Sequence, residues 1–85
     1  NYPNPFNMNT QIKYSIPEYS RVRLSIYNFL GEKVDDLVDH PQSPGTYIYN
    51  YDASGLASGI YFYQLNAATD RGNGANYTRK MVLMK

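Results

Sequence analysis

The run Ile60-Tyr61-Phe62-Tyr63-Gln64-Leu65-Asn66-Ala67 is the segment of the chain most strongly disposed to form a β-strand. Its β-branched and aromatic residues fit a pleated, half-buried surface. Apolar residues occupy both sides of the alternation, which is typical of a central strand covered on both faces. We therefore expect the hydrophobic core to be centred on residues 60–67.

Other runs alternate apolar and polar residues, as strands with one buried face do. Strands are expected at Ile12–Ile16, Val22–Ile26, Thr46–Asp52 and Tyr77–Met84. Within residues 46–52, three tyrosines (Tyr47, Tyr49 and Tyr51) alternate with Ile48 and Asn50. This pattern leaves open which face of that strand is buried.

The segment from residue 31 to residue 38 breaks the simple alternation. Gly31-Glu32 can close a tight hairpin, and the run Lys33–Val38 that follows is interrupted by Asp35-Asp36. Such an interruption is typical of a β-bulge or an edge strand. We therefore expect a bulged or edge strand over residues 33–38.

Glycine, proline and small polar residues mark the connections between strands. Loops are expected at His40–Gly45, Ala53–Gly59 and Thr69–Asn76, and Leu56 can tuck inward where the chain crosses between two sheets. The opening Tyr2–Phe6 contains two prolines, which favour extended backbone, so it should form a stiff lead-in anchored by Phe6.

Short strands at roughly ten-residue spacing, linked by such turns, predict an all-β fold. We expect an antiparallel immunoglobulin-like β-sandwich of about seven short strands. A chain of 85 residues suffices for one core, so residues 1–85 should form a single domain. Because the chain opens at Asn1 without an initiator methionine, we expect it to be excised from a larger protein.

Composition argues against several classes of function. The 8 Lys+Arg residues nearly balance the 7 Asp+Glu residues and are scattered, so nucleic acid is not an expected partner. The chain has no cysteine, and thus neither a disulfide framework nor a thiolate metal site. No apolar run is as long as a membrane span, and no basic segment followed by an apolar one opens the sequence, so we expect neither a membrane span nor a signal peptide in these residues.

Chemistry-bearing residues are few, and we expect no enzyme activity and no cofactor. His40 is the single histidine, and Ser54 does not sit in a strand-to-helix nucleophile elbow. Asp35, Asp36 and Asp39 could offer oxygen ligands to calcium, but no calcium-loop motif is present, and solubilising an edge strand explains them better. We therefore assign no metal site.

The tyrosines support an alternative function. A face formed by Tyr47, Tyr49 and Tyr51 could stack on sugar rings, which would make the chain a carbohydrate-binding or structural accessory module of a secreted enzyme. Covering the core or cross-strand neighbours is the competing explanation for these rings.

Five ordered blocks of sequence resemble the type IX secretion C-terminal sorting domain (type A). The blocks are Asn1–Asn7, Ile12–Tyr14 with Ile16-Pro17, Val22–Asn28 leading to Gly31–Val34, Asp52–Leu65 and Lys80–Lys85. The Tyr-Pro-Asn-Pro-Phe opening and the Gly-Ile-Tyr-Phe strand are also similar to the immunoglobulin-like domain of flagellar hook-capping proteins.

The resemblance implies a C-terminal sorting signal on a Bacteroidetes-type exported protein. Its partners would be an outer-membrane translocon, a sortase-like peptidase that removes the domain and attaches the cargo to the surface, and an N-terminal cargo domain. The protein would be secreted or displayed on the cell surface, via the periplasm and the outer membrane. Recognition would fall on Gly59, Ile60, Tyr61, Lys80, Met81, Val82, Leu83, Met84 and Lys85, and the cargo junction on Tyr2, Pro3, Asn4, Pro5 and Phe6.

Overall fold

Six β-strands account for most of the chain that the computed structural model describes, residues 9–72 and 74–84. They are β1 (Asn9–Ile16), β2 (Ser20–Asn28), β3 (Lys33–Gln42), β4 (Gly45–Asp52), β5 (Gly59–Ala68) and β6 (Asn76–Leu83). The predicted all-β antiparallel sandwich is confirmed, with six strands described where about seven were expected. The predicted lead-in Tyr2–Phe6, with its anchor Phe6, lies outside the described residues.

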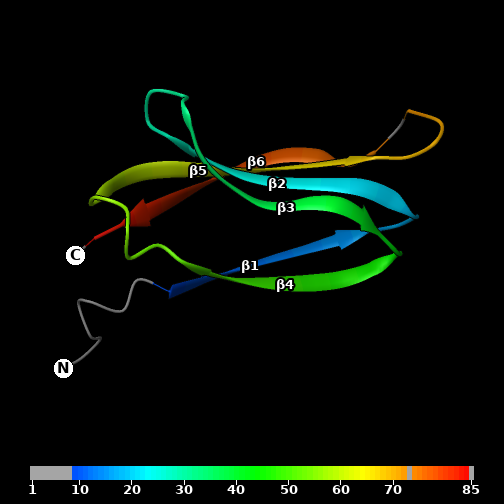
Figure 1. The fold of residues 1–85 in the computed structure, drawn as a ribbon, viewed down its shortest axis with the longest axis horizontal. Helices are drawn as coiled ribbons and strands as arrows, with labels where there is room; N and C mark the ends of the chain where they lie inside the picture. The colour runs from blue at the N-terminus through cyan, green and yellow to red at the C-terminus, as the bar shows by residue number, and fades with distance from the viewer. Residues whose placement is uncertain (1–8, 73, 85) are drawn as a thin grey trace.

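The strands form two layers (Figure 1). One sheet has four antiparallel strands in the order β3-β2-β5-β6, and the other pairs β1 with β4. In Figure 1 the β1–β4 sheet lies below the four-stranded sheet and runs along its length. The larger sheet therefore has an inner face, toward β1 and β4, and an outer face directed away from them.

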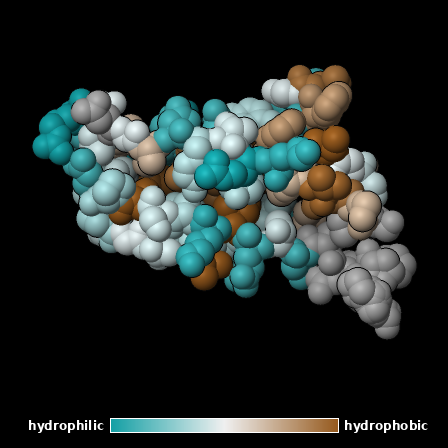
Figure 2. Space-filling view, turned by 180° about the vertical axis from the view of Figure 1, so that it is seen from behind, coloured by the Kyte–Doolittle hydropathy of each residue, from teal (hydrophilic) through white to brown (hydrophobic). Residues whose placement is uncertain are grey.

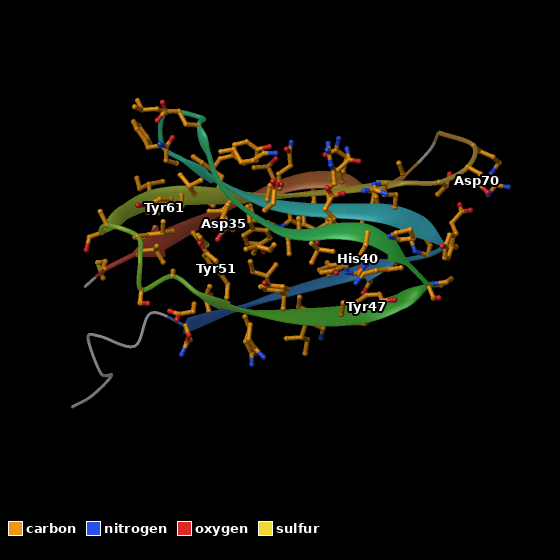
Figure 3. The ribbon with its side chains drawn as sticks, viewed as in Figure 1. Asp35, His40, Tyr47, Tyr51, Tyr61 and Asp70 are labelled. Carbon is orange, nitrogen blue, oxygen red and sulfur yellow. The ribbon has the colours of Figure 1, made fainter. Side chains whose placement is uncertain are left out.

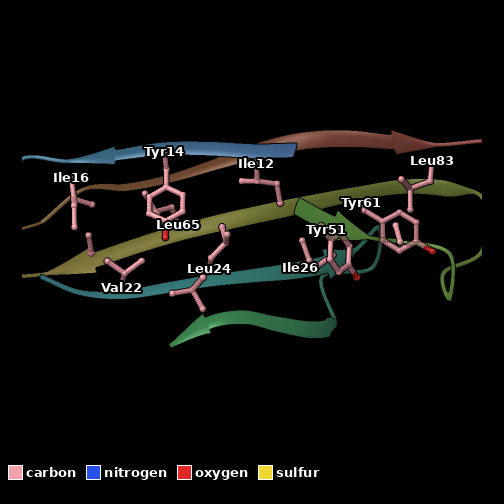
Figure 4. Packing of buried hydrophobic residues seen from close by; sticks show 13 residues of the cluster. Ile12, Tyr14, Ile16, Val22, Leu24, Ile26, Tyr51, Tyr61, Leu65 and Leu83 are labelled. Atoms are coloured by element: carbon pink, nitrogen blue, oxygen red, sulfur yellow. The ribbon is translucent and has the colours of Figure 1, made fainter. Parts of the chain in front are cut away.

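The core fills the space between the layers (Figure 4). Strand alternation turns every second residue of β1 and β2 inward, and these residues are almost fully buried: Ile12, Tyr14, Ile16, Val22, Leu24 and Ile26. Leu65 of β5, which is 0% exposed, lies opposite Leu24 in the β2–β5 register. The core is thus centred on β2 and β5, as the composition of residues 60–67 predicts.

The outer face of β5 differs from its prediction. This strand was expected to be covered on both faces, but the outward side chains of Ile60 and Asn66 are exposed. The two-stranded sheet covers only the inner face, so apolar character on the outer face does not imply burial. The expectation of a doubly covered strand was therefore wrong.

β3 confirms the predicted irregularity and extends further than expected. Its pairing with β2 shifts register between Leu24 and Ser25 and again between Ile26 and Tyr27, and β3 forms one edge of its sheet. The predicted loop His40–Gly45 was largely wrong, because the strand continues to Gln42. An edge strand tolerates Pro41, since a missing N–H costs nothing where no neighbour needs it.

The connections follow the predicted pattern elsewhere. The segment between β4 and β5 carries the chain from one sheet to the other, with Ala53 buried and Leu56 half-buried against the core. The β5–β6 loop brings the backbone at residue 74 so close to Ala67 that a Cβ atom there would overlap the Ala67 carbonyl oxygen. Only glycine fits at this position.

Candidate functional site

Two segments that lie far apart in the sequence meet at one end of the four-stranded sheet. The β5–β6 register places Gly59 opposite Leu83, Ile60 opposite Val82, and Tyr61 opposite Met81. The residues that the resemblance marks at 59–61 and at 81–83 are therefore neighbours across two strands. Strand alternation then divides these six residues between the two faces of the sheet.

The inward members of this group belong to the core. Tyr61 and Leu83 are buried, and Met81 packs partly buried against them. The Tyr61 hydroxyl donates a hydrogen bond of 2.8 Å to the Ala57 carbonyl, so the ring fixes the segment that leads into β5 (Figure 3). These side chains stabilise the fold and are poorly placed to contact a partner.

The outward members are accessible. Ile60 is 38% exposed and Val82 is 56% exposed, and Lys80 and Met84 are exposed beside them. Cross-strand pairs of β-branched residues commonly pack against another layer. Here no described layer covers this face of the sheet, so the apolar pair Ile60–Val82 is open to solvent.

The turn between β2 and β3 adds two large apolar side chains that the sequence interpretation missed. Phe29 is 69% exposed and Leu30 is 79% exposed. Asn28, which lies opposite Tyr61 in the register, holds the turn by accepting 2.9 Å hydrogen bonds at Oδ1 from the Leu30 and Glu32 amides. Two adjacent large apolar residues inside a turn were the signal available in the sequence.

We call the exposed group Phe29, Leu30, Ile60, Val82 and Met84 the outer apolar surface. Figure 2 shows hydrophobic side chains gathered at the end of the molecule that carries the β2–β3 turn. Beside this group, Tyr27, Phe62, Gln64 and Thr78 line a shallow hollow of about 210 Å³ on the sheet. Exposed apolar clusters on small domains commonly mark contacts with other proteins.

The acidic residues of β3 do not converge. Asp39 pairs with Arg21 at 2.8 Å, whereas Asp36 accepts a 2.8 Å hydrogen bond from the Ser25 hydroxyl. Asp35 faces the other sheet and lies 3.4 Å from the Tyr51 hydroxyl (Figure 3). Within residues 9–72 and 74–84, no group of three or more acidic, histidine or cysteine side chains is arranged to hold a metal ion.

The pKa shifts of groups on and beside β3 arise from their immediate neighbours. Burial, followed by the charge of Asp35, raises the pKa of the Tyr51 hydroxyl to about 12. The hydrogen bond from Ser25, followed by that from Lys33, lowers the pKa of Asp36. The Nδ1 atom of His40 lies 3.0 Å from the Pro41 carbonyl oxygen, and Ser54 lies in a different segment, between β4 and β5. These contacts stabilise β3 and the turns next to it.

Replacing Ser25 with alanine is expected to raise the pKa of Asp36 toward its ordinary value, because the hydroxyl hydrogen bond favours the charged carboxylate. The folded-state pKa is lowered, so the stability that Asp36 contributes is present above the ordinary pKa and is lost as pH falls through the folded value. NMR titration of the Asp36 carboxyl carbon measures this shift. An identical Asp36 pKa in both proteins would contradict the assignment.

The tyrosines of β4 face the core. Tyr51 is buried, while Tyr47 and Tyr49 pack partly buried against the core. The Tyr47 ring stacks on Tyr14 of β1, with 5.4 Å between ring centroids and 18° between planes. Its hydroxyl donates to the Ser43 carbonyl at 2.6 Å. The exposed large apolar residue of this strand is Ile48, on the opposite face, so the three rings do not form an open stacking face.

Among the described residues, no helix is long and apolar enough to cross a membrane. A small antiparallel sandwich that gathers exposed apolar side chains from three distant segments at one end has the make-up of a protein-recognition domain. The family model described as the secretion system C-terminal sorting domain matches residues 1–84, and the chain belongs to this family.

No curated protein and no solved structure matches the chain. Membership of the family establishes the class of function. The chain is a type IX secretion sorting signal with a non-catalytic role, and it interacts with the secretion machinery. A protein that carries it is exported to the cell surface or secreted.

Proposed function

We propose that the outer apolar surface, together with Lys80 and the terminal residues up to Lys85, is the part of the domain that the outer-membrane translocon recognises. The observation that carries this proposal is the β5–β6 register, which pairs Ile60 with Val82 on the exposed face. Export of a folded domain requires a surface that the machinery can contact, and these side chains are accessible without unfolding.

The marked residues divide between two roles in this proposal. Tyr61, Met81 and Leu83 hold β5, β6 and the core together, and Gly59 begins β5 with a φ of +159°, close to ordinary extended backbone. Ile60, Lys80, Val82 and Met84 contact the partner. Phe29 and Leu30 extend the same surface, because the turn that carries them starts opposite Tyr61.

The finer assignments rest on the family and the sequence. We propose that residues 1–85 act as one sorting unit, with a cargo domain joined through Tyr2–Phe6, and that a sortase-like peptidase removes the unit after export. The identity of the cargo, including any enzyme activity, belongs to the parent protein. The likeness to hook-capping domains stays a prediction.

The double variant Ile60→Thr, Val82→Thr tests the surface. Threonine keeps the β-branched shape and removes apolar contact area, so the thermal midpoint should change little while export of a fused reporter falls by about fivefold or more. Export is measured as the fraction of reporter outside the periplasm in a type IX-competent bacterium.

Ile48→Thr is the matched control, because Ile48 is also an exposed apolar strand residue but lies on the outer face of β4. It should be exported like the parent. Equal export of the parent, the double variant and Ile48→Thr would show that the translocon does not recognise the Ile60–Val82 pair.

A further inference from the structure

Among residues 9–72 and 74–84, β6 pairs with β5 alone and so forms an edge of the four-stranded sheet, and the hydrogen-bonding groups along this edge can be assigned. The Ala67 amide donates to the Ala75 carbonyl at 2.8 Å, so these two opposed residues form a hydrogen-bonded pair. Pairs alternate along an antiparallel ladder, so Tyr77, Arg79 and Met81 bond to β5. The amides and carbonyls of Thr78, Lys80 and Val82 therefore point away from the sheet.

The two edges of the four-stranded sheet differ in how well they could accept another strand. β3 has two register shifts in its pairing, contains Pro41, and carries Asp35, Asp36 and Asp39. Bulges, proline and charge are devices that block edge-to-edge pairing. β6 pairs with β5 over eight residues without a shift and contains no proline, so its edge is regular.

The inner side of β6 is incompletely covered. Tyr77 and Met81 face inward but are only partly buried, and Arg79 between them is exposed, with its guanidinium carbon 4.5 Å from the centre of the Tyr77 ring. A further strand paired with β6 would place its own inward side chains beside Tyr77 and Met81. It would thereby cover the parts of these two side chains that are now exposed.

The charge of β6 indicates the chemistry of that strand. Arg79 and Lys80 are adjacent cations, and β6 contains no Asp or Glu. The structure records no ion pair for either of them within residues 9–72 and 74–84. β1 and β4 pair only with each other among the described residues, and they carry only one charged residue each. Acidic side chains on an added strand would complement this pair of cations.

We propose that the secretion machinery recognises this domain by β-strand addition, with an acidic, extended segment of the translocon pairing along the free edge of β6. This inference rests on the proposed recognition of the domain by the translocon. The outward amides of Thr78, Lys80 and Val82 supply the main-chain contacts, and carboxylates of the added strand pair with Arg79 and Lys80. A second copy of the chain is a poorer occupant, because antiparallel pairing centred on two β6 strands would set these cations against each other.

Thr78→Pro tests the main-chain contacts. Proline removes an outward amide without removing a bond to β5, and an edge strand accepts it, so the variant should stay folded. Export of a fused reporter is expected to fall by about fivefold or more, because one donor is lost and the added strand is blocked. Thr78→Val keeps the amide and should be exported like the parent.

The charge is tested in the same assay with Arg79→Glu, Lys80→Glu, which should reduce export, and with Lys13→Glu on β1, which should not. If the parent is exported and Thr78→Pro is exported equally while folded, strand addition is overturned and sorting stands. If the parent itself stays in the periplasm, the translocon does not recognise this domain and the proposed function fails. A parent dimer that Thr78→Pro dissociates in sedimentation velocity would assign the edge to a second copy and overturn the acidic partner.

Discussion

Leu65→Ala should lower the free energy of unfolding by about 2–5 kcal/mol, because Leu65 is 0% exposed and the surrounding strands cannot collapse into the cavity. Leu65 lies between Leu24 of β2 and Tyr77 of β6, at the centre of the sheet. At about 0.05–0.15 kcal/mol per residue, a domain of this size has only about 4–13 kcal/mol of stability. Urea denaturation followed by tyrosine fluorescence measures the loss.

Asn66→Ala is the control for this prediction, since Asn66 is the next residue of the same strand but is exposed on the outer face. Its free energy of unfolding should stay within about 0.5 kcal/mol of the parent value. If Leu65→Ala were as mild as Asn66→Ala, the core would not be centred on β2 and β5.

Deleting residues 80–85 should abolish both folding and export. The deletion removes the four β6 residues that pair with Gly59–Phe62, and these include the buried Leu83 and the half-buried Met81. The remaining edge would expose inward side chains of β5, including Tyr61. The decrease in the free energy of unfolding should therefore exceed that of a single core substitution. Circular dichroism during heating would show loss of the cooperative transition.

Deleting only residues 84–85 separates the effect on folding from the effect on export. Met84 is exposed and follows the last β6 residue, Leu83, so the thermal midpoint should hold within a few degrees. Export should fall, because Met84 belongs to the outer apolar surface. A folded domain after removal of residues 80–85 would contradict the structural role of β6, and unchanged export after removal of 84–85 would exclude a role for the terminal pair.

Strand alternation explains why much of the fold was predictable. Ile12, Tyr14 and Ile16, and then Val22, Leu24 and Ile26, each repeat every second residue, and each set is buried. The Asp35-Asp36 interruption correctly indicated a bulged edge strand, because a shift in register breaks the alternation along the chain itself. Such signals are local, so the sequence carries them directly.

Features that depend on neighbouring layers were not predictable in the same way. Apolar residues on both sides of β5 indicated two covering layers, yet Ile60 faces solvent because β1 and β4 cover only the inner face. Proline at position 41 indicated a loop, but whether a strand can contain it depends on its being at an edge. Which face of β4 is buried likewise depends on the four-stranded sheet, against which the β4 tyrosines pack.

The candidate recognition site was predictable in its residues but not in its geometry. The resemblance marked Gly59–Tyr61 and Lys80–Lys85, and the β5–β6 register then brings the described parts of these segments together. Phe29 and Leu30 were not predicted as recognition residues, because residues 28–31 were interpreted only as the point where the strand alternation stops. Their contribution follows from the β2–β5 pairing, which joins residues far apart in the sequence.

Export of a reporter fused to residues 1–85 tests the central claim most directly. The fusion would be expressed with a periplasmic leader in a type IX-competent bacterium, and the reporter would be measured in the periplasm, on the cell surface and in the medium. We expect the fused reporter to leave the periplasm and the reporter without the domain to remain there. A fused reporter that is folded and stable but stays in the periplasm would contradict the sorting function.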